Sequence, residues 1–242
     1  MHVDRGALEA ALEQLRNQVP PGSVVEPALK RVVSATSGLF GVSGAGLLLV
    51  DDAQVLRYVA ASDEAGRVLE TAHEQTGEGP CIDAFVLDRS VSTDDVEGDD
   101  RWPRLTPLLL TAGVRGVLGA PVRLGGGPVG TLNVYVDHPY PWDASDRDAI
   151  GAFVSVVEGM FSSAVLAEQQ SKIVDQLQYA LDNRVLIDRA IGLLMGREGL
   201  DQVTAFDRLR VAARSSRRKV AELARELLEG RSPGDADDAP RS

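Results

Sequence analysis

Apolar residues recur every three or four positions over residues 3–18 and 24–39, which predicts two amphipathic helices at the start of the chain. Pro20-Pro21-Gly22 separates them, because proline cannot continue a helix. Beyond residue 40 the pattern changes to short apolar runs bounded by turn residues. The elements predicted there are strands over 46–50, 55–61, 91–92, 116–124 and 129–136 and short helices over 67–75, 81–87 and 102–111.

The clearest strand signal lies in the last pair of these runs, which flank Gly125-Gly126-Gly127-Pro128. Leu132, Val134 and Val136 alternate there with Thr131, Asn133 and Tyr135. A period of two fits a strand that packs one face on a core. Helices followed by mostly antiparallel strands, inserted short helices and a closing helix are typical of an α+β domain.

Asp143 begins a helical pattern that runs without a proline to residue 197 and predicts one long helix. Its apolar positions change phase along the way. The first stripe, near Ile150 and Phe161, is expected to pack on the sheet. The second is expected to pack on a partner helix in a homodimer; the alternative is a bent or broken helix with both stripes buried in one chain. The second stripe contains Leu166, Ile173, Leu177, Ala180, Ile187, Ile191 and Leu194.

Two shorter helices follow the turn at Gly199. Asp201 is the expected N-cap of a helix over 202–213, and Ser215 or Ser216 is the expected N-cap of the next. The predicted fold is therefore an α+β domain of mostly antiparallel sheet with flanking helices, a long helix, and a small all-α three-helix domain. The chain is expected to consist of an N-terminal helix at 1–21, the α+β domain at 22–165 and the helical domain with a coiled-coil linker at 166–230. Residues 231–242 form a tail whose composition is typical of disorder.

Composition restricts the class of protein. The longest apolar runs are too short to cross a membrane, and the N-terminal stretch lacks the apolar segment of a signal peptide, so a cytoplasmic protein is expected. Cys81 is the single cysteine, which excludes an intramolecular disulfide and a multi-cysteine metal site. The three histidines show no metal-ligand spacing along the chain, so no metal site is predicted.

The charge is distributed unevenly. The net charge is −11, yet residues 1–170 carry 12 basic and 24 acidic side chains while residues 171–230 carry 11 and 9. Residues 208–221 hold six basic side chains and no acid. Such a split indicates a module that faces nucleic acid, although a basic helix is often simply a solvated surface.

Residues 177–229 resemble the ANTAR domain, a three-helix RNA-binding module of transcription antitermination regulators. The resemblance rests on Ala190-Ile191-Gly192, Leu194-Met195, the Gly199 turn, Ala205-Phe206, Leu209-Arg210 and Leu223-Ala224. Ile191 departs from the family, which often has lysine before this glycine. The resemblance implies RNA hairpins as partners. Basic side chains would contact phosphates and small residues would allow close approach. The predicted RNA face contains Ala205, Arg208, Ala212, Arg214, Arg217, Arg218 and Lys219; Arg210 is left out because it can pair with Asp207.

Residues 22–165 resemble a GAF domain, a small-molecule-sensing fold, through GEGPCIDAF at 77–85, the paired strands of 116–136 and the helix start at Asp143. The resemblance implies a pocket between the sheet and the inserted helices, with an unidentified ligand and an unknown cofactor. Candidate lining residues are Tyr58, Cys81, Trp102 and Tyr135, with His73 as a further candidate. Cys81 begins a helix, where the pKa of a thiol can be lowered, although a small buried residue is the simpler interpretation.

Together the two resemblances predict a signal-responsive RNA-binding antiterminator without enzymatic activity. No nucleophile–base pair, HExxH motif or phosphate-binding loop is present in the sequence. Two alternatives stay open, a DNA-binding transcription regulator and a coiled-coil interaction adaptor. Binding to RNA hairpins but not to duplex DNA would separate them.

Overall fold

The computed structural model describes residues 5–18, 24–40, 42–51, 53–166 and 172–230, so the predicted turn at residues 20–22 and the predicted disordered tail lie outside the described residues. The strands are β1 (Gly44–Val50), β2 (Leu56–Ala61), β3 (Val91–Thr93), β4 (Gly116–Leu124) and β5 (Gly127–Val136). The helices are α1 (Arg5–Gln18), α2 (Val25–Phe40), α3 (Glu64–Thr76), α4 (Pro80–Leu87), α5 (Thr106–Thr111), α6 (Ala144–Leu166), α7 (Lys172–Glu198), α8 (Gln202–Ser216) and α9 (Val220–Leu228).

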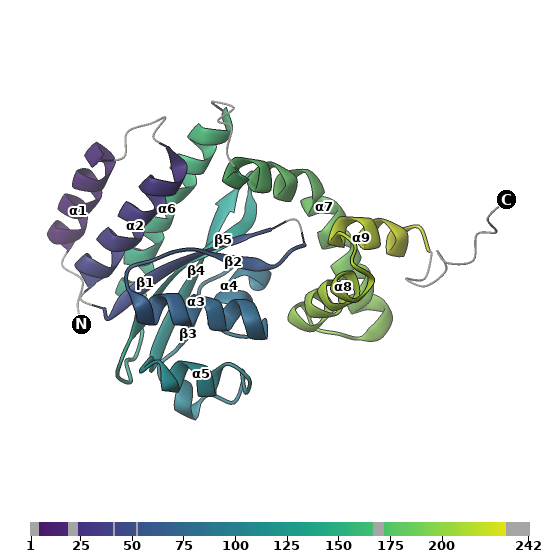
Figure 1. Cartoon of the computed structure of the whole chain (residues 1–242), viewed down its shortest axis with the longest axis horizontal. Helices are drawn as coiled ribbons and strands as arrows, with labels where there is room; N and C mark the ends of the chain where they lie inside the picture. Colours follow the sequence, from purple (N-terminus) through teal and green to yellow (C-terminus); the bar gives the residue numbers. More distant parts are fainter. Residues whose placement is uncertain (1–4, 19–23, 41, 52, 167–171, 231–242) are drawn as a thin grey trace.

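The strands form one antiparallel sheet in the order β2-β1-β5-β4-β3. Helices α2 and α6 cover one face, α3 and α4 pack on the other, and α1 lies outside α2 (Figure 1). The strand pairs predicted over 46–61 and 116–136 are both present, as the hairpins β1–β2 and β4–β5. The α+β class is therefore confirmed, with the core between the sheet and its two helical layers.

Strand β5 is buried on both faces. Leu132, Val134 and Val136 are on the apolar face, as predicted. The opposite face, with Thr131, Asn133 and Tyr135, is at most 2% exposed. Asn133 there bonds to Glu70 of α3, so the polar side of the alternation lies under helices instead of in water. A sequence pattern shows which residues share a face of a strand but not what covers that face.

The segment predicted as one long helix contains two helices, α6 and α7. Residues 167–171 between them lie outside the described residues. Most of the stripe expected to pack on a partner helix is buried within the chain: Leu177, Ile187 and Leu194 are 1%, 3% and 6% exposed, whereas Leu166 at its start is 84% exposed. Helix α7 packs these residues against α8, α9 and the sheet. The part of the stripe on α7 therefore matches the alternative, burial within one chain, because partners in the same chain already occupy it.

Helix α6 has the length and apolar content of a helix that could cross a membrane, and it is the only one among the described residues. Its apolar face packs on β4 and α2, with Ile150, Phe153 and Val157 fully buried. These buried positions account for part of this composition, since 39% of the apolar window is buried.

Helix α8 begins where predicted, since the Asp201 side chain accepts a hydrogen bond from the Thr204 amide at 3.0 Å. The prediction for the following helix was wrong. Ser215 and Ser216 lie in the last turn of α8 and donate to the carbonyl of Ala212, and Lys219 is the N-cap of α9. Serine hydroxyls compete in this way for carbonyls near a helix end, so sequence alone does not distinguish the two roles.

Candidate functional site

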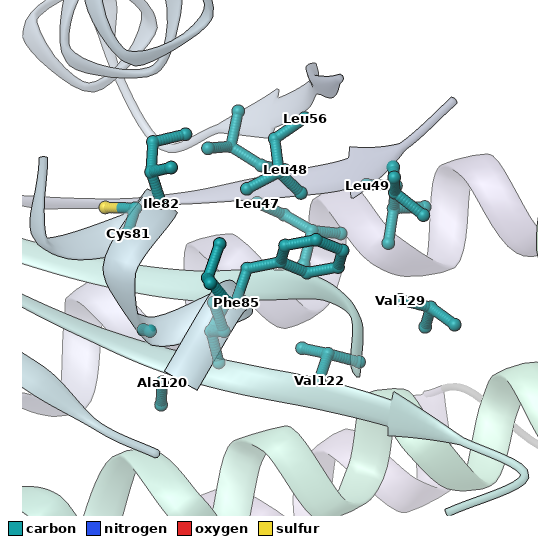
Figure 2. Packing of buried hydrophobic residues seen from close by; sticks show 14 of the residues in the cluster. Leu47, Leu48, Leu49, Leu56, Cys81, Ile82, Phe85, Ala120, Val122 and Val129 are labelled. Atoms are coloured by element: carbon teal, nitrogen blue, oxygen red, sulfur yellow. The ribbon is translucent and has the colours of Figure 1, made fainter. Parts of the chain in front are cut away.

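A buried polar cluster lies between the sheet and helices α3 and α4. Glu70 and His73 come from α3, one turn apart, and Cys81 comes from the first turn of α4. One ligand-type atom from each residue lies within 4.8 Å of those of the other two, and all three side chains are fully buried. Figure 2 shows Cys81 at the start of α4, beside Ile82 and Phe85 and the buried leucines of β1.

Small residues in the sheet make room for this cluster. A Cβ atom at Gly46 would lie 2.1 Å from the Glu70 carboxylate, and one at Gly119 would lie 3.1 Å from Cys81 Cα. Asn133 on β5 donates from Nδ2 to both oxygens of Glu70, at 2.9 and 3.1 Å. Side chains therefore occupy the space in which the sequence predicts a ligand pocket.

Burial sets the protonation of the cluster. Loss of hydration raises the pKa of Glu70 to about 8 and lowers the pKa of His73 to about 4, so both side chains favour their neutral forms. Burial, followed by the nearby Glu70 and Asp83 carboxylates, raises the pKa of Cys81. The idea that the start of a helix lowers the pKa of this thiol was wrong, because desolvation outweighs the helix terminus.

The structure brings together only some of the predicted pocket residues. Cys81 and His73 are in the cluster, and Tyr135 lies on the same face of β5 as Asn133, with its hydroxyl donating to Asp63 at 2.6 Å. Trp102 is buried but donates to Asp83 on α4, at 3.1 Å. Tyr58 is 40% exposed on β2, so its assignment to a buried pocket was wrong.

Sequence reasoning missed Glu70 and Asn133. Two signals were available, the spacing of three residues between Glu70 and His73 on one helix, and the polar alternation that contains Asn133. Neither shows burial, because an amphipathic helix and a half-exposed strand give the same patterns.

The predicted RNA face lies at the junction of α8 and α9. Arg214, Arg217 and Lys219 are exposed there, and the Lys219 ammonium lies 4.7 Å from the centre of the Tyr179 ring. Arg217 has a φ of 54°, so the left-handed conformation of this residue makes the corner between the helices. We call Arg214, Arg217 and Lys219 the basic corner.

Other members of the predicted face have different roles. Ala205 is fully buried in the helical core, so its assignment to close approach of RNA was wrong. Arg218 forms ion pairs with Glu222 and Glu226, the latter at 2.6 Å, and so stabilises the start of α9. Arg208 pairs with Glu198 at 2.6 Å but stays 60% exposed, and Ala212 is half-buried.

The helical domain is docked on the α+β domain beside the turns that join the strands (Figure 1). The rings of Phe85 on α4 and Phe206 on α8 meet edge to face with centres 5.8 Å apart. The Gln202 side chain donates to the Val86 carbonyl at 2.6 Å. Ile191 lines a small cavity of about 50 Å³ in this interface. An apolar side chain suits this location, although ANTAR domains often have lysine at this position, because an unpaired charge is costly to bury.

Arg210 joins the helical domain to the loop between α3 and α4. Its guanidinium donates to Asp207 at 2.6 Å, as the sequence suggested, and it is only 8% exposed. A Cβ atom at Gly77 in that loop would lie 2.0 Å from Arg210 Nη2, so the side chain sits directly on the loop backbone. The loop joins α3 to α4, and its Gly79 lies against the His73 imidazole, so the loop borders the polar cluster.

Gly77→Ala is expected to loosen this docking. Gly77 has a φ of 67°, so alanine is strained by about 1–2 kcal/mol and must also displace the buried Arg210 guanidinium. Gly113→Ala is the matched control, because Gly113 has a φ of 75° and no atom near its Cβ position. Hydrogen exchange should accelerate in α8 for Gly77→Ala and stay unchanged there for Gly113→Ala. Equal behaviour of the two variants would contradict the contact.

Comparison with known proteins places both parts of the chain. Residues 25–160 match the model of the GAF domain, and residues 175–228 match the model of the ANTAR domain. No curated protein matches the chain.

Solved structures support the α+β fold. Free methionine-R-sulfoxide reductase from Neisseria meningitidis is 18% identical with a TM-score of 0.55, over 68% of this chain and 95% of that one. The GAF domain of a phosphoenolpyruvate-protein phosphotransferase from Coxiella burnetii is 16% identical with a TM-score of 0.54, over 68% and 98%. At these identities the similarity shows the fold alone. The match over 25–160 covers more than half of the chain, which therefore belongs to the GAF domain family and carries an ANTAR domain after the GAF domain.

Proposed function

We propose that this protein is a signal-responsive RNA-binding regulator that acts in transcription antitermination, with residues 22–165 as the sensor and residues 166–230 as the RNA-binding part. The ANTAR match supports the RNA partner, and GAF and ANTAR domains are both regulatory modules. The protein is proposed to act in the cytoplasm and to have no enzymatic activity of its own.

The basic corner is the observation that carries this proposal. Its three cations project from two helix ends of the ANTAR domain in a protein whose net charge is −11. Phosphate groups are attracted to such a corner by its positive charge and by the dipole at the N-terminus of α9. Arg208 adds a fourth exposed cation one to two turns earlier on α8.

The docked arrangement suggests how a signal reaches the RNA-binding part. Helix α8 rests on α4 and on the loop that borders the polar cluster. A small molecule bound in the GAF domain would therefore change the surface against which α8 packs. We propose that this change in the surface shifts the equilibrium between ANTAR domains docked on the GAF domain and ANTAR domains released from it. The released domains would bind pairs of RNA hairpins and block a transcription terminator.

A homodimer through the helices α6 and α7 is also part of this proposal. The buried stripe of α7 is not available for it, so the dimer would use other surfaces of these helices. Sedimentation analysis of the full chain measures the oligomeric state directly.

The discriminating experiment compares binding of the purified full chain to a pool of structured RNA hairpins and to duplex DNA of matched length. We expect hairpin binding that weakens with salt, because counterions are released from the phosphates. Binding to duplex DNA alone would favour the DNA-binding regulator. Binding to neither would favour the interaction adaptor, and either result would overturn the proposal.

A further inference from the structure

The polar cluster of Glu70, His73 and Cys81 has the composition of a metal-binding site. A carboxylate, an imidazole and a thiol are the three side-chain types that bind zinc-like ions in proteins. Their ligand-type atoms lie within 4.8 Å of one another. The ligands of a tetrahedral zinc ion are about 3.3–3.8 Å apart, as follows from bond lengths of about 2.0–2.3 Å. The ligand atoms would have to approach one another by up to about 1.0–1.5 Å to enclose one ion.

His73 is oriented for this role. Its Nδ1 lies 2.8 Å from the Leu69 carbonyl, to which a ring N–H donates, so the lone pair is left on Nε2. Nε2 is fully buried and has no hydrogen-bond partner among the described residues. A buried acceptor without a partner is costly. A backbone carbonyl that fixes the far nitrogen of a histidine is the usual arrangement behind a metal ligand.

Neighbouring groups hold the Glu70 carboxylate, and the charges of the ligands match that of a divalent cation. Asn133 Nδ2 holds both oxygens of Glu70, and Asn133 Oδ1 is buried without a partner among the described residues. A carboxylate and a thiolate carry two negative charges, which a divalent cation neutralises. An uncharged complex is what a fully buried site requires.

We propose that Glu70, His73 and Cys81 bind one divalent transition-metal ion of the zinc class. The site stands on its own geometry; only its use as the regulatory signal rests on the proposed function. Cys81 and His73 border the loop on which Arg210 packs, so contraction around an ion would act on the surface beneath α8.

The test is titration of the full chain, freed of metal with a chelator and kept reduced, with Co²⁺ and then with Zn²⁺. We expect one Co²⁺ per chain, a thiolate-to-cobalt charge-transfer band, and loss of the band when Zn²⁺ displaces cobalt. Cys81→Ser should abolish the band because Cys81 is the only cysteine, and His73→Ala should weaken Co²⁺ binding at least tenfold. His138→Ala is the control, since His138 is an exposed histidine.

The wild-type chain alone can overturn the proposal, whether or not the variants fold. Absence of the charge-transfer band in folded wild type, together with no rise in its melting temperature on adding Zn²⁺, would contradict the site. Equal affinity in wild type and a folded His73→Ala variant would also contradict it. Metal binding is measured without RNA, so its failure and a failure of hairpin binding are separate results.

Discussion

A variant that carries Arg214→Gln and Arg217→Asn is expected to bind hairpin RNA about tenfold more weakly or worse than the wild type. Both side chains are exposed at the basic corner, where each can approach a phosphate. A tenfold loss corresponds to about 1.4 kcal/mol, a modest requirement for two charged contacts. Asparagine is chosen at position 217 because it tolerates the left-handed conformation, so the corner itself is kept.

The matched control changes the net charge equally but elsewhere. Lys30→Gln with Arg67→Gln removes two cations from the surfaces of α2 and α3, where they pair with Glu26 and Glu64. We expect its affinity for the hairpin to stay close to that of the wild type. If both double variants lose the same affinity, the effect belongs to overall charge, and the corner is not the binding surface.

The metal-free wild type is expected to lose folding stability between pH 6.5 and 8. Glu70→Gln is expected to abolish this loss. Burial raises the pKa of Glu70 to about 8 in the folded chain, above its ordinary value of 4.5. The folded state therefore keeps a proton that the unfolded state releases, and the free energy of unfolding falls as pH rises toward 8. From pH 6.5 to 8 the expected loss is about 1.5 kcal/mol.

The chosen window separates Glu70 from its neighbour His73. Burial lowers the pKa of His73 to about 4, so this residue contributes stability that is lost as pH falls from 6.5 toward 4, below the window. Glutamine keeps the shape of Glu70 without the charge. The control is Glu74→Gln, which alters a surface carboxylate on the same helix as Glu70 that pairs with Arg57 of β2.

Urea unfolding at pH 6.5, 7.25 and 8, with a chelator present, measures this effect. The wild type and Glu74→Gln should lose stability together, while Glu70→Gln should stay level across the window. A Glu70→Gln variant with the same slope as the wild type would show that the Glu70 carboxyl is not held neutral in the folded chain.

The strands were predictable because alternation in 116–136 and the intervening glycines are local signals. What covers each face was not predictable. Asn133 looked like a solvent-facing position and proved to bond with Glu70, 63 residues away in the sequence. The second stripe of the long helical pattern is consistent with either a partner chain or a neighbouring helix, and only the fold selects the latter.

The basic corner was predicted as a group, but the roles within it were not. Arg218 is the clearest example, since it lies just before α9 and its side chain pairs with Glu222 and Glu226 along that helix. Ala205 was taken for a surface position, although it precedes the inward-facing Phe206 and is covered by neighbouring helices. The buried face of an amphipathic helix can be wide, so the periodicity does not show whether residues at the margin of that face are buried or exposed.

The salt dependence of hairpin affinity tests the central claim, that the basic corner contacts RNA phosphates, most directly. It is measured for the wild type and the Arg214→Gln, Arg217→Asn variant on one hairpin, over a range of salt concentrations. Each phosphate contact contributes about one unit to the slope of log affinity against log salt. We expect the slope to be about two units shallower for the variant. Equal slopes for the two proteins would contradict it.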